Sequence, residues 1–358
     1  MGKSAQRQNR KTGEGGDGRG KLANWPIIGH EWAVDLLAKV IADDRLSHAY
    51  LFTGPAQVGK TTLARTFARA ILCEKQTGEP CAVGDPDARA TACRTCRRIA
   101  EGRYPDLQII AAEKNTIQIE QVRVLQSDAA LSPLEGRRKV FILREIERAT
   151  APAANALLKT LEEPPPHVIL LLTSHRRDLV LPTVLSRCQI INLRPAPLTQ
   201  VQAMLTARFA AEPTQAELLA RLSGGRVGWA VEACLHPEVN AVRNRCLDEL
   251  LALTTAGHGG RLSWAEALSH QADLIEETLG LWAAWWHDVL LVQRGAPEAI
   301  VNLDRRGQLV QQAGLYRPEQ VEATLTDLMR TLQRIRANVN VRLALDVLAL
   351  RLPKPIVA

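Results

Sequence analysis

The residues with the clearest chemistry form a phosphate-binding loop. Gly54, Gly59, Lys60 and Thr61 match the pattern G-x4-G-K-T in full, after a short apolar run and before an amphipathic one. Glycines at these positions let backbone N–H groups surround phosphates at the start of a helix. Lys60 would reach the β- and γ-phosphates, and the Thr61 hydroxyl would face Mg²⁺. The sequence therefore predicts that these four residues and the adjacent Thr62 bind ATP or ADP; the alternative is a chance glycine-rich turn.

Hydrolysis needs two acids at the end of a later buried strand, and only one of them is present. The first acid of such a pair holds the water shell of the metal, and the second polarises the attacking water. Here the strand expected at 139–143 is followed by Arg144 and Glu145. A guanidinium about 5 Å from Mg²⁺ is repelled by several kcal/mol at an effective dielectric near ~20. We therefore predict that nucleotide is bound, with or without Mg²⁺, and hydrolysed weakly or not at all, unless another strand carries the acids.

Four of the seven cysteines form a cluster in the sequence. Cys73, Cys81, Cys93 and Cys96 follow the spacing C-x7-C-x11-C-x2-C. Four thiolates close a tetrahedral Zn²⁺ site without an open position, which makes such a site structural. The glycines and prolines between them suit a loop that a metal would order. We predict zinc at these four residues; the alternatives are reduced thiols in a core and, less favoured, a redox CxxC pair.

One arginine near the edge of the expected sheet domain has a position from which it could act on another molecule. Arg187 lies between the fourth and fifth expected strands. An arginine at a domain edge can stabilise the charge that develops on a neighbour's nucleotide, an effect of about 10³–10⁵ in rate. From spacing alone, a surface arginine in a weak salt bridge is the favoured interpretation.

The elements that must position these residues alternate between strands and helices up to about residue 195. Compact apolar runs typical of buried parallel strands occur at 48–53, 107–112, 139–143, 168–173 and 189–193. Amphipathic helical patterns at 61–72 and 151–162 lie between them, and the prolines at 164–166 end the second. This alternation predicts an α/β P-loop domain with a parallel sheet.

From residue 196 onward the sequence indicates helices alone. Long helical patterns occur near 272–292 and 321–352, and we expect three tryptophans, Trp282, Trp285 and Trp286, to pack in a core rather than stack on bases. The predicted organisation is a disordered basic tail at 1–23 and a nucleotide-binding domain at 24–195, with the cysteine module inserted at 73–96. A small helical lid domain at 196–240 and an all-α domain at 241–358 follow.

Composition and charge exclude few classes of function. The chain has 358 residues and a net charge of +7, and residues 1–23 carry six basic and two acidic side chains, a net of +4. Only +3 is left for the other 335 residues, so charge by itself does not indicate nucleic-acid binding. No apolar run approaches the ~20 residues of a membrane span, and no apolar segment typical of a secretory signal follows the basic N-terminus. We therefore expect a cytoplasmic protein.

Further motifs make the chain similar to a known family. Ile28–His30, Arg45–Gly54, Asn155–Pro164, Ser186–Cys188 and Ala337–Leu345 resemble, in order, segments of the clamp-loader subunits of bacterial DNA polymerase III, which are AAA+ proteins. The resemblance implies that Thr173 holds a sensor position and that Arg187 serves an ATP site on a neighbouring gamma-type subunit. It also implies a ring with tau/gamma and delta subunits, joined through a helical collar at 241–358, that places a sliding clamp on primed DNA.

The family has an ATP-hydrolysing kind of member, tau/gamma, and a delta-prime kind. Arg144 at the position of the metal-binding acid favours the delta-prime kind, although the intact phosphate loop departs from delta-prime subunits that no longer bind nucleotide. A tau/gamma-type loader, another AAA+ DNA-dependent ATPase and a zinc-dependent nucleic-acid adaptor are the alternatives.

Overall fold

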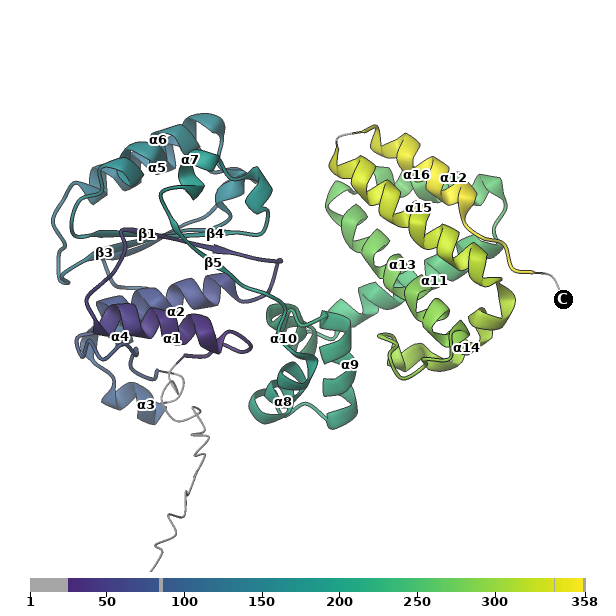
Figure 1. Ribbon diagram of the computed structural model, residues 1–358, viewed down its shortest axis with the longest axis horizontal. Coiled ribbons are helices and arrows are strands. Elements are labelled where there is room, and N and C mark those ends of the chain that lie inside the picture. Colours follow the sequence, from purple (N-terminus) through teal and green to yellow (C-terminus); the bar gives the residue numbers. More distant parts are fainter. Residues whose placement is uncertain (1–24, 84–85, 338, 357–358) are drawn as a thin grey trace, which may run out of the picture. The chain divides into compact units, whose positions relative to one another are not determined.

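The computed structural model describes residues 25–83, 86–337 and 339–356 (Figure 1). It comprises two compact units: the described residues up to Pro55 with Gly59–Arg194, and Ala56–Val58 with the described residues from Pro195 onward. The predicted tail at 1–23 lies outside the described residues. The division of the second unit into a lid and a collar stays a prediction.

A parallel sheet forms the centre of the first unit. Its strands are β1 (Ala49–Thr53), β2 (Leu107–Ile110), β3 (Lys139–Leu143), β4 (Val168–Ser174) and β5 (Gln189–Asn192), in the order β2-β3-β4-β1-β5. Every residue of β1, β3 and β4 is buried, which is why these strands read as unbroken apolar runs, whereas β2 and β5 form the partly exposed edges. The α/β prediction is confirmed.

Helices cover both faces of this sheet (Figure 1). Helices α1 (Glu31–Ala42), α2 (Lys60–Leu72) and α4 (Arg94–Ala100) lie on one side, and α5 (Ile119–Ala129), α6 (Ala151–Glu162) and α7 (Pro182–Leu185) lie on the other. The Thr150 hydroxyl caps the start of α6 by accepting a hydrogen bond from the Ala153 N–H. The short helix α3 (Pro86–Thr91) and α4 belong to the inserted cysteine segment.

The second unit is helical throughout its described residues. It contains α8 (Leu198–Phe209), α9 (Pro213–Ser223), α10 (Val227–Leu235), α11 (Glu238–Thr255), α12 (His258–Ser269), α13 (Ala272–Gln293), α14 (Arg306–Leu315), α15 (Pro318–Arg336) and α16 (Val341–Arg351). The pattern expected at 321–352 is two helices rather than one, because the Asn340 side chain accepts a hydrogen bond from Leu343 N–H and starts α16 as a new helix.

Tryptophans fill the core of this second unit. Trp282, Trp285 and Trp286 on α13 are fully buried, as expected for packing rather than for base stacking. Trp282 also stacks on Trp264 with ring centroids 4.4 Å apart and donates its indole N–H to the Cys246 carbonyl. Among the described residues, no helix combines the length and the apolar character needed to cross a bilayer.

Candidate functional site

The phosphate loop connects β1 to α2 and depends on two glycines. Gly54 has φ +138°, and a Cβ atom there would lie 2.3 Å from the Leu193 carbonyl oxygen, so no side chain fits. Gly59 has φ +108° and caps the N-terminus of α2. Thr61 and Thr62 follow in the first turn of that helix. The loop therefore ends at a helix N-terminus, where free backbone N–H groups and the helix dipole favour an anion.

Lys60 is buried at this helix start. Its ammonium donates to the carbonyl oxygens of Gly54, at 2.7 Å, and Pro55. Burial lowers its pKa to about 8, while the carboxylates of Glu147 and Glu145 oppose that shift. The loop thus holds a cation between backbone carbonyls and acids, in the position from which the motif lysine would reach phosphate.

The carboxyl ends of β3 and β4 bring two of the other predicted residues together. The Glu145 backbone N–H donates to the Thr173 hydroxyl at 3.1 Å, and Thr173 is buried. Glu145 has φ +55°, an uncommon left-handed conformation for glutamate, and its carboxylate pairs with Arg148 at 2.7 Å. Arg144 directly follows β3, as expected, and its Nε is buried without a hydrogen-bond partner among residues 25–83, 86–337 and 339–356.

A second acid at this edge was missed by the sequence reasoning. The Glu147 side chain is only 4% exposed, and its Oε1 accepts the His175 backbone N–H at 3.0 Å and lies 2.8 Å from His175 Nδ1. Burial opposes ionisation, but the hydrogen bonds from His175 lower the pKa of Glu147 to about 2. The only signal in the sequence is an acid two residues after Glu145, which is too common to single out.

Arg187 lies just beyond α7, at the surface of the first unit. Its guanidinium pairs with Glu162, the last residue of α6, at 2.7 Å and also donates to the Thr183 carbonyl at 3.0 Å. The side chain is 34% exposed. Within this chain it makes the surface salt bridge that spacing alone favoured, and it contacts none of the other predicted nucleotide-site residues through a described hydrogen bond or ion pair.

The four predicted cysteines come together between the end of α2 and the start of α4. Their sulfurs all lie within 4.8 Å of one another, with Cys73 Sγ 3.7 Å from Cys81 Sγ and 3.9 Å from Cys93 Sγ. Cys73 ends α2, and the Cys93 sulfur caps α4 by accepting the Cys96 N–H. Hydrogen bonding from Cys96 lowers the pKa of Cys73 to about 5. The cysteines form no disulfide, and the cluster could hold a tetrahedral metal ion.

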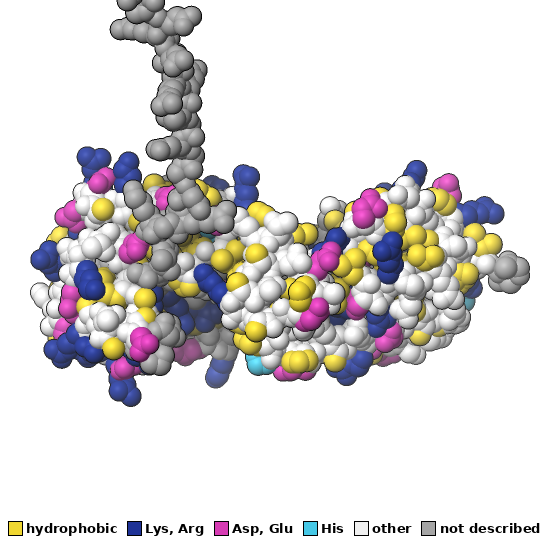
Figure 2. Space-filling view, turned by 90° about the horizontal axis from the view of Figure 1, so that it is seen from below, with side chains coloured by type: hydrophobic (Ala, Val, Ile, Leu, Met, Phe, Trp, Pro, Cys, Tyr) yellow, Lys and Arg dark blue, Asp and Glu magenta, His cyan; other side chains and the backbone are white. Residues whose placement is uncertain are grey.

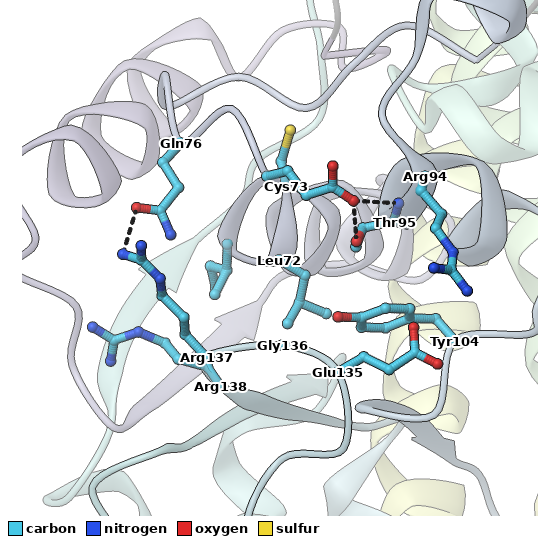
Figure 3. A pocket seen from close by; sticks show the side chains of 12 residues that line it. Leu72, Cys73, Gln76, Arg94, Thr95, Tyr104, Glu135, Gly136, Arg137 and Arg138 are labelled. Carbon is cyan, nitrogen blue, oxygen red and sulfur yellow. Dashed lines mark hydrogen bonds between the residues drawn. The ribbon is translucent and has the colours of Figure 1, made fainter.

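A pocket of about 710 Å³ lies beside this cluster rather than at the phosphate loop (Figure 3). Tyr104, Glu135 and Arg137 are among the residues that line it. One of its walls is braced by Glu74, whose carboxylate accepts the backbone N–H and the hydroxyl of Thr95 at 3.0 and 2.9 Å. This brace links the end of α2 to the start of α4 and so fixes the two halves of the cysteine cluster.

The face drawn in Figure 2 carries surface charges of both signs. On the face drawn in Figure 2, lysine and arginine side chains are interspersed with aspartate and glutamate. This mixture agrees with the small net charge outside residues 1–23.

Comparisons with known proteins find similarity to subunits of DNA polymerase III. A family model described as DNA polymerase III, delta subunit, matches residues 29–197. The delta' subunit of DNA polymerase III from Bacillus subtilis (strain 168) is 29% identical over 320 residues, which are 88% of this chain and 94% of that protein. The tau subunit from Escherichia coli (strain K12) is 37% identical over 205 residues, 56% of this chain and 30% of that protein, so the chain spans less than a third of it.

Among solved structures, a DNA polymerase III gamma subunit-related protein from Thermotoga maritima matches with a TM-score of 0.38 and 17% identity, over 89% of this chain and 98% of that chain. The family model and the near full-length match to a delta' subunit agree with each other and with the phosphate loop at the edge of a parallel sheet. The comparisons support a delta' subunit of DNA polymerase III, to which the chain is similar over nearly its full length.

Proposed function

We propose that the chain is a clamp-loader subunit that binds nucleotide, hydrolyses it weakly or not at all, and acts on a neighbouring ATPase subunit. The observation that carries this proposal is Arg144, which stands directly after β3 where an ATPase has the acid for its metal. Glu145, the acid next to it, is paired with Arg148, which competes with the attacking water for its carboxylate. A bound ATP or ADP would then serve as a structural ligand.

The phosphate loop supports nucleotide binding independently of hydrolysis. Gly54 has no Cβ, so its backbone can pass close to the Leu193 carbonyl. Lys60 supplies a buried cation at a helix N-terminus. Charge-assisted hydrogen bonds of this kind are about twice as strong as neutral ones. We infer that Gly54, Gly59, Lys60, Thr61 and Thr62 contact the phosphates, and that Thr173 and Glu145 lie at the γ-phosphate end.

Arg187 supports a role in trans. Its present partner, Glu162, is 49% exposed, and exposed ion pairs contribute only about 0–1 kcal/mol. Exchange of that carboxylate for the phosphates of a nucleotide on an adjacent subunit would therefore cost little. In this proposal Arg187 stabilises charge that develops on the neighbour's γ-phosphate during hydrolysis.

The cysteine cluster supports a structural zinc site. A tetrahedral site with Zn–S distances of about 2.3 Å has sulfur–sulfur edges of about 3.8 Å. The separations of 3.7 and 3.9 Å from Cys73 agree with that value, and three of the four cysteines are buried. Zinc would fix the loop between Cys73 and Cys96, where few large apolar side chains are available to form a core.

The partners follow from the family. The clamp-loader complex implied by the tau/gamma and delta' relatives would contain tau/gamma and delta subunits beside this chain, joined through the helices at 241–358. It would place a sliding clamp on primed DNA, and DNA would be reached through the assembled complex.

The decisive experiment compares ATP turnover by the isolated chain with turnover by the loader reconstituted from all its subunits. The isolated chain should release phosphate at or near background. Arg187→Ala should lower turnover of the reconstituted loader by about the share of the one site that Arg187 serves while assembly is retained, because a finger arginine contributes about 10³–10⁵ to the rate at its own site only. Arg177→Ala, an exposed arginine in the same region, is the matched control. Normal turnover with Arg187→Ala would remove the trans role.

The intact phosphate loop also favours a second candidate, an active tau/gamma-type loader or another AAA+ DNA-dependent ATPase. That candidate predicts DNA-stimulated hydrolysis by the isolated chain, abolished by Lys60→Ala. Rapid turnover of this kind would replace the first proposal.

A further inference from the structure

A buried carboxylate stands beside the phosphate loop without a partner for one of its oxygens. Glu147 lies in η2 (Ile146–Arg148), the short turn after β3. His175 holds its Oε1 through two contacts of 2.8 and 3.0 Å, whereas its Oε2 is buried and has no hydrogen-bond partner in the described parts of the chain. A buried, unsatisfied polar atom in a native protein calls for an explanation, of which an ion is one.

The Glu147 carboxylate is negatively charged and fixed in place. Its side chain is 4% exposed, and the bonds from His175 keep its pKa near 2 despite burial. Taking such a charge out of water is costly unless a cation or several hydrogen-bond donors compensate it. His175 satisfies one oxygen only, so the other is available to a cation.

Sheet topology brings this carboxylate to the nucleotide edge. Strand β4 lies between β3 and β1, with Thr53 of β1 in register with Ser174 of β4. Glu147 follows β3, His175 follows β4, and Lys60 follows the loop after β1, so all three lie at the carboxyl ends of neighbouring parallel strands. Of the two acids that raise the pKa of Lys60, Glu147 has the larger effect and Glu145 the smaller.

We propose that Glu147 takes over the task of the acid that Arg144 displaces and holds the Mg²⁺ of a nucleotide bound at the phosphate loop. The inference rests on the proposed nucleotide binding. Magnesium is typically held by one or two carboxylates together with substrate phosphates and water, and a fixed carboxylate with a free oxygen fits that donor set. His175 is a positioning residue, because it holds Glu147 in this orientation.

This arrangement separates metal binding from cleavage. Glu147 would supply the charge that anchors the metal, while Arg148 competes with water for the Glu145 carboxylate. The chain would therefore retain Mg-nucleotide tightly and cleave it slowly, which is how a nucleotide acts as a structural ligand.

The test measures the affinity of the full-length chain for a fluorescent ATP analogue, with Mg²⁺ and with EDTA. For the unmodified chain we expect Mg²⁺ to tighten binding at least tenfold. Glu147→Gln keeps an oxygen for His175 but removes the charge, so it should abolish the gain from Mg²⁺ while affinity in EDTA changes by no more than twofold. Glu120→Gln, an exposed acid on α5, is the matched control and should retain the full gain.

A rescue variant makes the result specific. Arg144→Asp combined with Glu147→Gln should restore the gain from Mg²⁺, because the acid returns to its usual position. His175→Ala should give a partial loss, since it frees Glu147 to move. An undiminished Mg²⁺ effect in Glu147→Gln would overturn this inference and leave nucleotide binding intact, whereas failure of the unmodified chain to bind in both buffers would overturn nucleotide binding itself and this inference with it.

Discussion

The two chemical sites of this protein lie at opposite ends of one helix and meet opposite electrostatic conditions. Helix α2 runs from Lys60 to Leu72, about 20 Å, with the phosphate loop at its N-terminus and Cys73 at its C-terminus. The N-terminal end carries free N–H groups and about half a positive charge, whereas the C-terminal end carries free carbonyls and about half a negative charge. An anion is therefore favoured at the first end and disfavoured at the second.

This difference indicates which site depends on its ligand. The phosphate loop offers backbone donors and a buried lysine that exist before any nucleotide binds. The cysteine cluster holds Cys73 next to a helix C-terminus, where hydrogen bonds from thiols and backbone N–H groups, or a metal, must compensate the charge of a thiolate. In the proposed function, the backbone organises the phosphate loop and a metal organises the cysteine module. The following predictions test that contrast, from the largest expected effect to the smallest.

The largest effect is expected from Cys96→Ser. The Cys96 sulfur is fully buried within the cluster, and a serine hydroxyl is a poor zinc ligand, so zinc content should fall from about one per chain to below about 0.1. The measurement is zinc released on denaturation of purified protein. Cys234→Ser, on α10 and outside the cluster, should leave zinc content unchanged. An equal zinc content in the Cys96 and Cys234 variants would show that the metal is bound elsewhere.

The second effect is expected from Lys60→Ala. Loss of the buried Lys60 ammonium should weaken ATP binding about 100-fold, or ~2.7 kcal/mol, because its charge-assisted contact to phosphate is lost. Titration with a fluorescent ATP analogue measures the change. Arg65→Ala removes an exposed cation from the same helix and should have little effect. Comparable losses in both variants would mean that general charge, rather than the loop, determines binding.

The sequence predicted the fold well where burial is complete. Strands β1, β3 and β4 each contain an unbroken run of apolar residues, and their predicted limits agree with the observed ones to within a residue. The edge strand β2 ends at Ile110, two residues before the predicted end, because an edge position imposes less burial. The second half of the chain was predicted as helical, but helix limits there depended on local caps such as Asn340.

The site was predictable only where it is contiguous in sequence. The phosphate-loop motif spans 8 residues, and the four cysteines span 24 residues. Glu147 could not be recognised, because its environment depends on His175, which is 28 residues away and directly follows the next strand. Likewise, nothing in the sequence indicated that Arg187 pairs with Glu162 or that Glu145 pairs with Arg148. The first pairing joins the end of α6 to the segment after α7, which local patterns do not specify, and the second depends on the left-handed turn at Glu145.

A smaller effect is expected from Gly54→Ala. The new Cβ would lie 2.3 Å from the Leu193 carbonyl oxygen, and φ is +138°, so the backbone must shift. Overpacking and conformational strain of this kind cost about 1–3 kcal/mol. Urea denaturation should show that loss, together with weaker ATP binding. Gly280→Ala, inside α13 where a Cβ would meet nothing within 4 Å, should not destabilise the protein, because alanine favours a helix over glycine by about 0.8–1 kcal/mol. Equal stability of the two variants would contradict the proposed tight contact.

The smallest effect is expected when metal is removed and nucleotide binding is measured. Leu63, Phe67 and Ile71 anchor α2 along its buried side, and Phe67 contacts Tyr50 of β1 edge-to-face at 5.0 Å. The N-terminus of the helix is therefore held by the sheet and not by Cys73. Zinc is stripped with a chelator, and the chelator is then removed. The affinity for ATP of the stripped protein should differ from that of the untreated protein, measured in the same buffer, by less than about twofold, or ~0.4 kcal/mol. A loss of tenfold or more would mean that the two ends of α2 are coupled, and that the cysteine module stabilises the phosphate loop as well as itself.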